Sequence, residues 1–400
     1  MVWASAAAGV ATLALRPRSG LIEPAPVEAR DYFSSEEIDR ARAYQRPQRA
    51  LGLAARALDG AALAVLALRP PRRARRAIAR AESQPLAGAA AVGAGLSLGF
   101  GALGLPLAAV RHRRAVKVGI SVQTWPAWFS DVAKASAIGA TLNAGALAGA
   151  MGLLRRFPKT WWAPAAAGGT ALSSVFILLS PVLLDPVFNK FEPLPEGDLR
   201  SEVLELADRA GVKVGEVYRV DASRRTTAAN AYVTGLSRTK RVVLFDTLLN
   251  DFPPGEVRSV VAHELSHVRH RDVQRALVWL GIASPAGMHL VQRLTEWITG
   301  DEDEPSPASL PALVLSLGVV SFAGGLAGNA LSRRVEQRAD AFALNLTEDP
   351  QSFIELEKRL ALKALADPQP PRILQKLFGT HPDAIERIGY GVAYALRGPR

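Results

Sequence analysis

The chain has 400 residues and no cysteine, which excludes disulfide frameworks, cysteine zinc sites and thiol nucleophiles. Any metal must therefore be held by His, Asp or Glu. The 48 Lys and Arg residues against 37 Asp and Glu residues give a net charge of +11, which fits either nucleic acid or anionic lipid headgroups as a partner.

Long blocks of the sequence lack Asp, Glu, Lys and Arg, and a helix needs about 20 mostly apolar residues to cross a bilayer. Four blocks satisfy this requirement: 83–110, 135–154, 160–184 and 305–332. Residues 277–292 form a shorter candidate, and residues 1–15 and 50–68 form two weaker ones. The sequence therefore predicts about seven spans. A soluble Ala/Gly-rich helical protein is the alternative, but buried soluble helices rarely run so long without a charge.

Arginine clusters border these spans at 69–80, 111–114 and 155–159. They lack interleaved aromatic residues and a recognisable nucleic-acid-binding fold, so headgroup-facing loops are favoured over nucleic-acid patches. The loop 296–307 is acidic and contains no Lys or Arg, which predicts that it faces away from the cytoplasm. The polar segments on either side of the last two spans would then face the cytoplasm. Counting the spans back from the first polar segment places the basic loops 69–80 and 155–159 outside. Loops rich in Lys and Arg normally face the cytoplasm, so either a span is miscounted or this rule fails locally.

The chain divides into four zones: membrane helices (1–188), a first polar segment (189–272), a transmembrane hairpin (273–332) and a second polar segment (333–400). The first polar segment has mixed α and β patterns. We expect a helix from Leu199 that stops at Gly211, strands at 216–221, 230–235 and 241–246, and a helix at 254–272. The predicted fold is mainly α, with a small α+β domain that the two polar segments form together.

The last of these helices carries the sequence HELSH. His263 and His267 are one turn apart on the same face, so both imidazoles can reach one ion, and Glu264 beside them can take a proton from a metal-bound water. A third ligand is required, and Glu336 is the preferred candidate. Asp340, one turn further on, can accept a hydrogen bond from a ligand histidine. The alternatives are His270 as a ligand, or a surface helix in which Glu336 pairs with nearby arginines.

HExxH followed by SRRVEQRADAFA at 332–343 resembles the CAAX prenyl protease 1 family of integral-membrane zinc endopeptidases. The segments 188–212, 221–249 and 381–388 are also similar to that family, as are the loops at 32–47 and 118–135. Ser266 stands where the family usually has glycine, and an acidic residue common near 115–121 is missing.

The resemblance implies seven spans, a zincin-like catalytic domain and one zinc ion per chain, bound by His263, His267 and Glu336. It implies Glu264 as general base and His381 as the group that stabilises the oxyanion. Two further roles follow: Asn230 and Ala231 pair with an extended substrate, and Arg387 pairs with Asp340 or another carboxylate. The residues alone favour a simpler reading of His381, as a turn residue before Pro382.

The most favoured function is a membrane zinc metalloendopeptidase that acts on peptides or proteins, either prenylated or membrane-bound. The Ala/Arg/Gly-rich composition indicates a high-GC bacterium, where prenylated substrates are scarce. Membrane protein quality control of the heat-shock type is a second enzymatic hypothesis, and a non-catalytic zinc-binding scaffold is a third. The intact Glu264 argues against the scaffold, because zinc binding alone needs no base. The sequence does not specify the substrate, the cleavage position or the oligomeric state.

Overall fold

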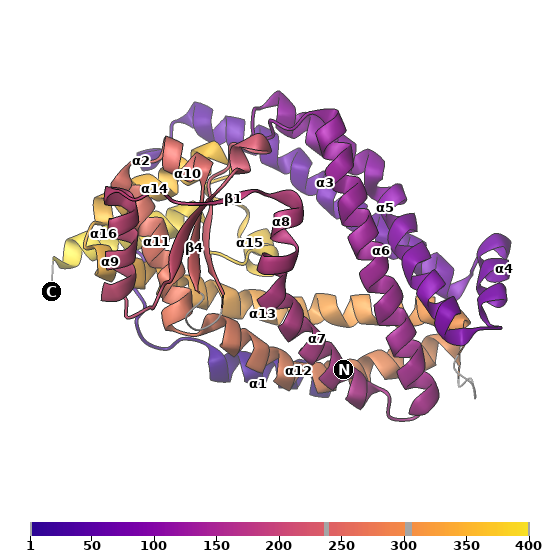
Figure 1. Ribbon diagram of the computed structural model, residues 1–400. Helices are drawn as coiled ribbons and strands as arrows, with labels where there is room; N and C mark the ends of the chain where they lie inside the picture. The colour runs from indigo at the N-terminus through magenta and orange to yellow at the C-terminus, as the bar shows by residue number, and fades with distance from the viewer. Residues whose placement is uncertain (1, 236–239, 301–305, 399–400) are drawn as a thin grey trace.

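The structure is a computed structural model that describes residues 2–235, 240–300 and 306–398 (Figure 1). The first half of the chain is helical: α1 (Val2–Leu15), α2 (Ala29–Tyr32), α3 (Ser35–Leu68), α4 (Arg72–Ala81), α5 (Pro85–Lys117), α6 (Trp125–Arg156), α7 (Trp162–Leu183) and α8 (Asp185–Phe188). A mixed region follows, with β1 (Phe191–Pro193), α9 (Asp198–Arg209), β2 (Glu216–Val220), β3 (Ala231–Thr234), β4 (Arg241–Phe245), α10 (Asp246–Asp251) and α11 (Pro254–Arg269). The remainder is helical again: α12 (Asp272–Thr299), α13 (Leu310–Thr347), α14 (Pro350–Lys363), α15 (Arg372–Phe378) and α16 (Ala384–Arg397). Single 3-10 turns occur at Ala222–Arg224 and Pro307–Ser309.

Five helical segments among the described residues are long and apolar enough to cross a membrane: Ser35–Leu68, Pro85–Lys117, Trp125–Arg156, Trp162–Phe188 and Pro307–Thr347. They include the four charge-free blocks and the weaker candidate at 50–68. The candidate at 277–292 lies in α12, which is long enough to cross a bilayer but is not among these five apolar segments. α1 has only 14 residues and is therefore shorter than a full span. The mainly helical fold is confirmed, whereas the count of seven spans stays a prediction.

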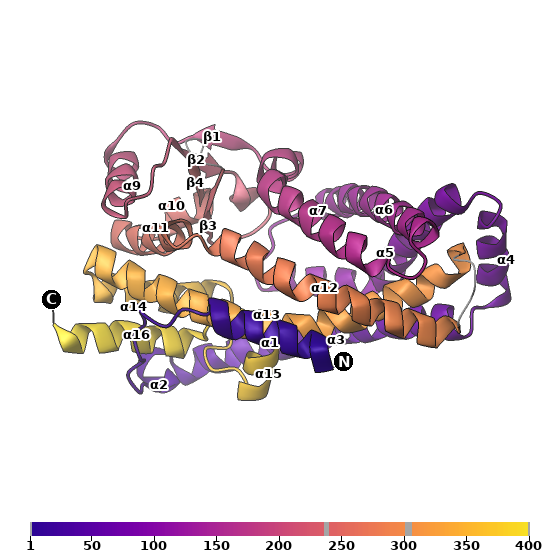
Figure 2. The ribbon, with the colours of Figure 1, turned by 90° about the horizontal axis from the view of Figure 1, so that it is seen from below.

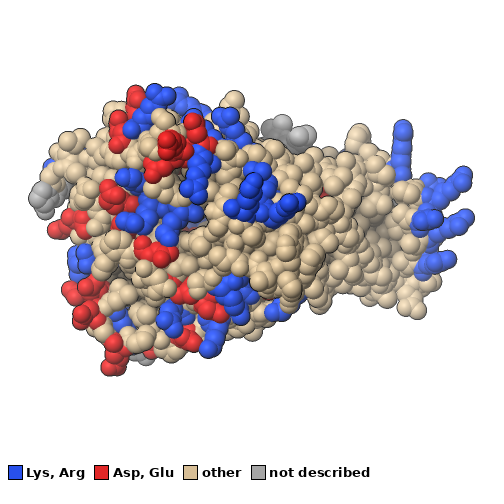
Figure 3. Space-filling view, turned by 90° about the horizontal axis from the view of Figure 1, so that it is seen from above, with Lys and Arg blue, Asp and Glu red and all other residues tan. Residues whose placement is uncertain are grey.

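The charged side chains are divided between the two ends of the molecule. Figure 3 shows Lys, Arg, Asp and Glu over the end that holds the sheet, then a band nearly free of charge, and finally a group of basic residues at the far end. This far end is α4, whose five arginines (Arg72, Arg73, Arg75, Arg76 and Arg80) are all exposed. The pattern fits a bilayer around the band, with polar regions on both sides.

A four-stranded sheet in the order β1-β2-β4-β3 forms one wall of the unit that the two polar segments build. β2 and β4 are parallel, and the two outer pairings are antiparallel. Val217 of β2, Leu244 of β4, Leu265 of α11 and Leu344 of α13 are fully buried in one core, so residues far apart in sequence support the same site. β3 pairs only with β4 among the described strands, which leaves its other edge open.

The two polar segments of the chain meet in this core, and α13 joins them to the membrane region without a break. α13 has 38 residues and passes through the expected boundary at 332/333.

The segment between α1 and α2 packs against the same unit. Gln337 donates to the carbonyl of Ile22 at 2.9 Å, and the Ala25 amide donates to the carbonyl of Gly389 at 2.9 Å. Figure 2 shows α12, α13 and α1 running together along the molecule.

Candidate metal centre

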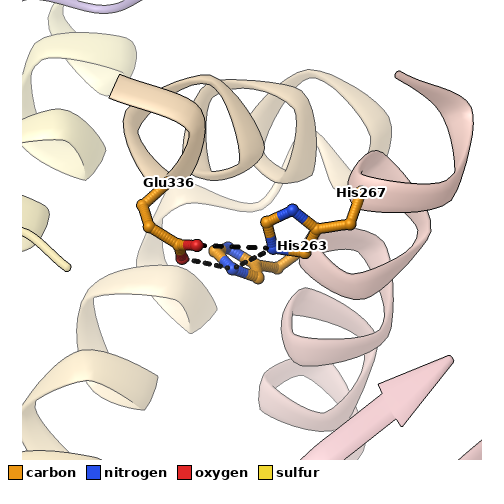
Figure 4. A group of neighbouring side chains, drawn as sticks. All are labelled: His263, His267 and Glu336. Atoms are coloured by element: carbon orange, nitrogen blue, oxygen red, sulfur yellow. Dashed lines mark hydrogen bonds and ion pairs between the residues drawn. The ribbon is translucent and has the colours of Figure 1, made fainter. Parts of the chain in front are cut away.

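α11 is oriented by a buried apolar stripe. Pro254 lies in the first turn, where its missing amide hydrogen costs nothing, and Val257, Val261 and Leu265 follow at four-residue intervals with at most 2 % exposure. Their burial in the core turns the opposite face of α11, which carries His263 and His267, toward α13. Figure 4 shows the two imidazoles and the Glu336 carboxylate converging from these two helices.

These three side chains form a compact group of potential ligands. One ligand atom from each of His263, His267 and Glu336 lies within 4.8 Å of the others. Nε2 of His263 is 3.1 Å from Oε2 of Glu336, and Nε2 of His267 is 3.7 Å from Oε1 of the same carboxylate. Two imidazoles and one carboxylate are a donor set typical of catalytic zinc sites, in which a water or substrate occupies the fourth position.

The second nitrogen of each imidazole is held by its own carboxylate. Nδ1 of His263 lies 2.8 Å from Asp340, and Nδ1 of His267 lies 3.1 Å from Asp272. Each carboxylate in turn has an arginine: Arg387 donates to Asp340 through Nε at 2.9 Å, and Arg338 donates to Asp272. Because this arrangement fixes the ring orientation and directs both Nε2 atoms inward, the residues present fit a divalent metal.

Asp272 and Arg338 were missed by the sequence analysis. The helix predicted at 254–272 ends at Arg269, and this is a correction to that prediction. Arg271 has a φ of 57°, in the left-handed region, and therefore turns the chain between α11 and α12. The turn brings Asp272, the first residue of α12, back beside His267. The sequence signal that could have indicated Asp272 is its position in a polar stretch, five residues after the ligand candidate His267.

The remaining predicted residues lie around the three ligand candidates. Nε2 of His381 is 3.2 Å from Oε2 of Glu336, and Arg333 supports this loop by donating to the carbonyl of Gly379 at 2.6 Å. Asn230 and Glu264 line one pocket with His263 and His381, and Ala231 begins β3 beside it. His270 instead contacts Ser266 and Phe342, with Nδ1 at 2.9 Å from the Ser266 carbonyl, and is directed away from the group.

Burial and neighbouring charges set the protonation states of Glu264 and His263. Burial raises the pKa of the Glu264 carboxyl, although the nearby imidazoles act in the opposite direction. At His263, burial disfavours the charged form, but the hydrogen bonds to Asp340 and Glu336 outweigh it and raise the pKa to about 10. Without a metal His263 is therefore protonated at neutral pH, and a metal must displace that proton.

Metal affinity is accordingly expected to fall as the pH is lowered. With one proton displaced from His263, the apparent affinity should drop by about tenfold per pH unit below the raised pKa. Competition with a fluorescent zinc chelator between about pH 6 and about pH 8 measures this slope. Asp340→Asn removes the main partner of His263 and should flatten the slope. An affinity that does not change over this interval would contradict the assignment of His263 as the protonated ligand.

The comparisons with known proteins agree with this geometry. The model described as "Peptidase family M48" matches residues 193–390, and the model described as "CAAX prenyl protease N-terminal, five membrane helices" matches residues 21–190. The uncharacterized metalloprotease YhfN of Bacillus subtilis is 33 % identical over 291 residues, covering 71 % of this chain and 68 % of that protein. The chain belongs to peptidase family M48.

Other members of family M48 extend the comparison. A CAAX prenyl protease 1 homolog of Oryza sativa subsp. japonica is 32 % identical over 227 residues, which cover 54 % of this chain and 52 % of the plant protein. The chain thus spans about half the length of this relative. The crystal structure of Ste24p from S. mikatae has the same fold, with a TM-score of 0.76 at 21 % identity over 97 % of this chain and 95 % of that one. The resemblance found in the sequence is confirmed, and the chain is a membrane metalloprotease of the CAAX prenyl protease type.

Proposed function

We propose that the protein hydrolyses peptide bonds with one zinc ion bound by His263, His267 and Glu336. The observation that carries this proposal is that two imidazoles and one carboxylate meet beside the carboxyl group of Glu264. Bound zinc would supply Lewis acidity and lower the pKa of a coordinated water. The polar segments 189–272 and 333–400 then act as one catalytic unit, carried by the membrane regions 1–188 and 273–332.

The roles of the surrounding residues follow from where they lie. Glu264, whose pKa is raised by burial, is a stronger base than an exposed glutamate and takes the proton of the attacking water. Asp340 and Asp272 keep the ligand imidazoles in one orientation. Burial lowers the pKa of His381, so at neutral pH a neutral imidazole faces the reacting carbonyl and can donate one hydrogen bond to the oxyanion.

The substrate is an extended peptide segment that adds to the open edge of β3. The strand begins directly after Asn230, which lines the pocket that also holds Glu264 and His381. Main-chain hydrogen bonds to β3 would hold the peptide in register, as in other cases of strand addition. Prenylated and membrane-bound peptides both fit this proposal, because α13 carries Glu336 and the apolar turns of a membrane span on one helix.

The test is proteolysis of quenched fluorescent peptides, prenylated and unprenylated, by detergent-purified protein with its metal content measured. Chelation should stop cleavage, and added zinc should restore it. Cleavage of prenylated peptides alone would indicate CAAX-type processing, whereas cleavage of unstructured segments from membrane proteins would indicate quality control. Stoichiometric zinc without cleavage of any peptide would contradict the enzymatic proposal and favour the scaffold.

We also propose that the catalytic unit faces the cytoplasm, with α4 on the other side. Because the chain has no cysteine, single cysteines report this directly. Ser83, beside α4, and Ser201, on α9, are both exposed and lie at opposite ends of the molecule. A membrane-impermeant maleimide applied to intact cells should label Ser83→Cys and spare Ser201→Cys until the cells are opened. The reverse pattern would overturn this orientation and place the arginines of α4 in the cytoplasm.

A further inference from the structure

A second pocket, separate from the one beside the metal ligands, lies where α3, α5 and α15 meet. Its volume is about 520 Å³, within the roughly 300–1,000 Å³ of typical small-molecule sites. Three arginines line it, Arg49 and Arg56 of α3 and Arg111 of α5, together with apolar side chains such as Leu53 and Phe378. None of the described residues of α11 or β3 lines this pocket, so it is not part of the metal centre.

The charges around this pocket do not balance. Asp59 of α3 is the only carboxylate among the described residues that line it, against three arginines. None of the three guanidinium groups has a hydrogen bond or an ion pair within the described part of the chain. Asp59 and Arg56 are three residues apart on α3 but are not paired, and Oδ1 of Asp59 has no partner among the described residues. The excess of positive charge suits an anionic ligand.

Arg56 also lies at an unusual depth for a charged side chain. It is within the apolar stretch 50–68 of α3, a candidate membrane span. Arg49 directly precedes this stretch, and Arg111 directly follows the charge-free block 83–110 of α5. The pocket therefore begins at the polar end of two spans and extends along α3 by about 10 Å, from Arg49 to Arg56 at 1.5 Å per residue. A charged residue inside a span that lacks a protein partner indicates a functional site.

We propose that this pocket binds the phosphate group of an anionic phospholipid from the surrounding membrane. Guanidinium groups match phosphate oxygens with paired N–H donors, and three of them around one cavity suit a charged headgroup. The exposed side chains of Leu53 and Phe378 then provide apolar surface for the first part of an acyl chain. Free phosphate would bond to the arginines but leave this apolar surface uncovered. A peptide carboxylate is less suitable, because β3, the strand expected to bind the peptide, does not line the pocket.

The test is native mass spectrometry of the detergent-purified full chain, titrated with phosphatidylglycerol or with phosphatidylcholine of the same acyl chains. One phosphatidylglycerol is expected to bind with a Kd about tenfold or more below that of phosphatidylcholine. Arg49→Gln and Arg56→Gln each remove a charged donor and should raise the Kd of phosphatidylglycerol by about tenfold. Arg46→Gln changes an exposed arginine of α3 outside the pocket and should leave that Kd unchanged.

Gly52→Leu tests the pocket without changing its charge. A Cβ atom at Gly52 would meet no atom within 4 Å, and leucine favours a helix more than glycine does, so the fold should be retained while the new side chain fills part of the pocket. This variant should weaken phosphatidylglycerol binding as the two arginine variants do. Equal binding of the two lipids, or a preference for phosphatidylglycerol that survives all three pocket variants, would overturn the inference. Displacement of the lipid by inorganic phosphate at a comparable concentration, or by a peptide only when its C-terminal carboxylate is free, would overturn it in favour of that ligand.

Discussion

Replacing Glu264 by glutamine is expected to abolish peptide hydrolysis while the metal stays bound. The amide retains the size of the carboxylate but cannot accept a proton from the attacking water. Loss of a positioned general base typically costs about 10²–10⁴ in rate, so kcat should fall by that factor. Because His263, His267 and Glu336 are unchanged, zinc content should remain at the wild-type level. Initial rates on a cleaved peptide and metal analysis of the same preparation measure both quantities.

The matched control is Glu205→Gln, an exposed glutamate of α9 on the same polar side of the molecule. It should leave rate and metal content unchanged. A Glu264→Gln protein that keeps more than about a tenth of the activity would show that another group accepts the proton. A variant that loses its metal together with its activity would instead assign Glu264 a role in holding the site.

Replacing Arg387 by methionine is expected to produce the largest loss of stability. Arg387 is the shared partner of Asp340 and Glu357, whose side chains are 0 % and 3 % exposed. Methionine fills much of the same space but leaves the buried Glu357 carboxylate without a counter-ion and Asp340 with His263 alone. Breaking a buried ion pair in this way costs about 3–5 kcal/mol of unfolding free energy. Denaturant or thermal unfolding of the metal-free protein in detergent measures the loss separately from any change in metal affinity.

Two further variants make this prediction specific. Adding Glu357→Gln to Arg387→Met removes the unpaired charge of Glu357 and should recover part of the stability, with a coupling that a double-mutant cycle measures. Arg258→Met breaks a surface pair with Glu202, in which both side chains are 39 % exposed, and should cost no more than about 1 kcal/mol. Equal losses for Arg387→Met and Arg258→Met would contradict the role assigned to the buried network.

Local sequence patterns were sufficient to predict most helices and strands but not the hydrogen bonds and ion pairs around the metal site. The charge-free blocks, the helix after Leu199 and the three strands between 216 and 246 were predictable, because their periodicity and turn residues are local signals. β1 was missed because three residues are too few to show alternation.

Arg338 illustrates what the sequence could not show. It was interpreted as one of several arginines that could pair with Glu336 on a surface helix. In the structure it is 5 % exposed and pairs with Asp272 of another helix. That contact joins residues 66 positions apart, and it depends on the left-handed turn at Arg271. A single non-glycine residue with positive φ has no reliable sequence signal.

The unbroken course of α13 means that the bilayer and the metal site are mechanically linked. This helix is about 57 Å long at 1.5 Å per residue, and it carries both apolar turns in the membrane and Glu336 near its polar end. A rotation of α13 by one residue position, about 100°, would move the Glu336 carboxylate away from the helix face that contacts α11. Side chains of α13 that are buried against the other membrane helices, such as Leu313 and Ser316, therefore help to set the angular position of a ligand about 30 Å away along the helix. A change in how the membrane helices pack against α13 is therefore expected to alter the geometry of the metal site.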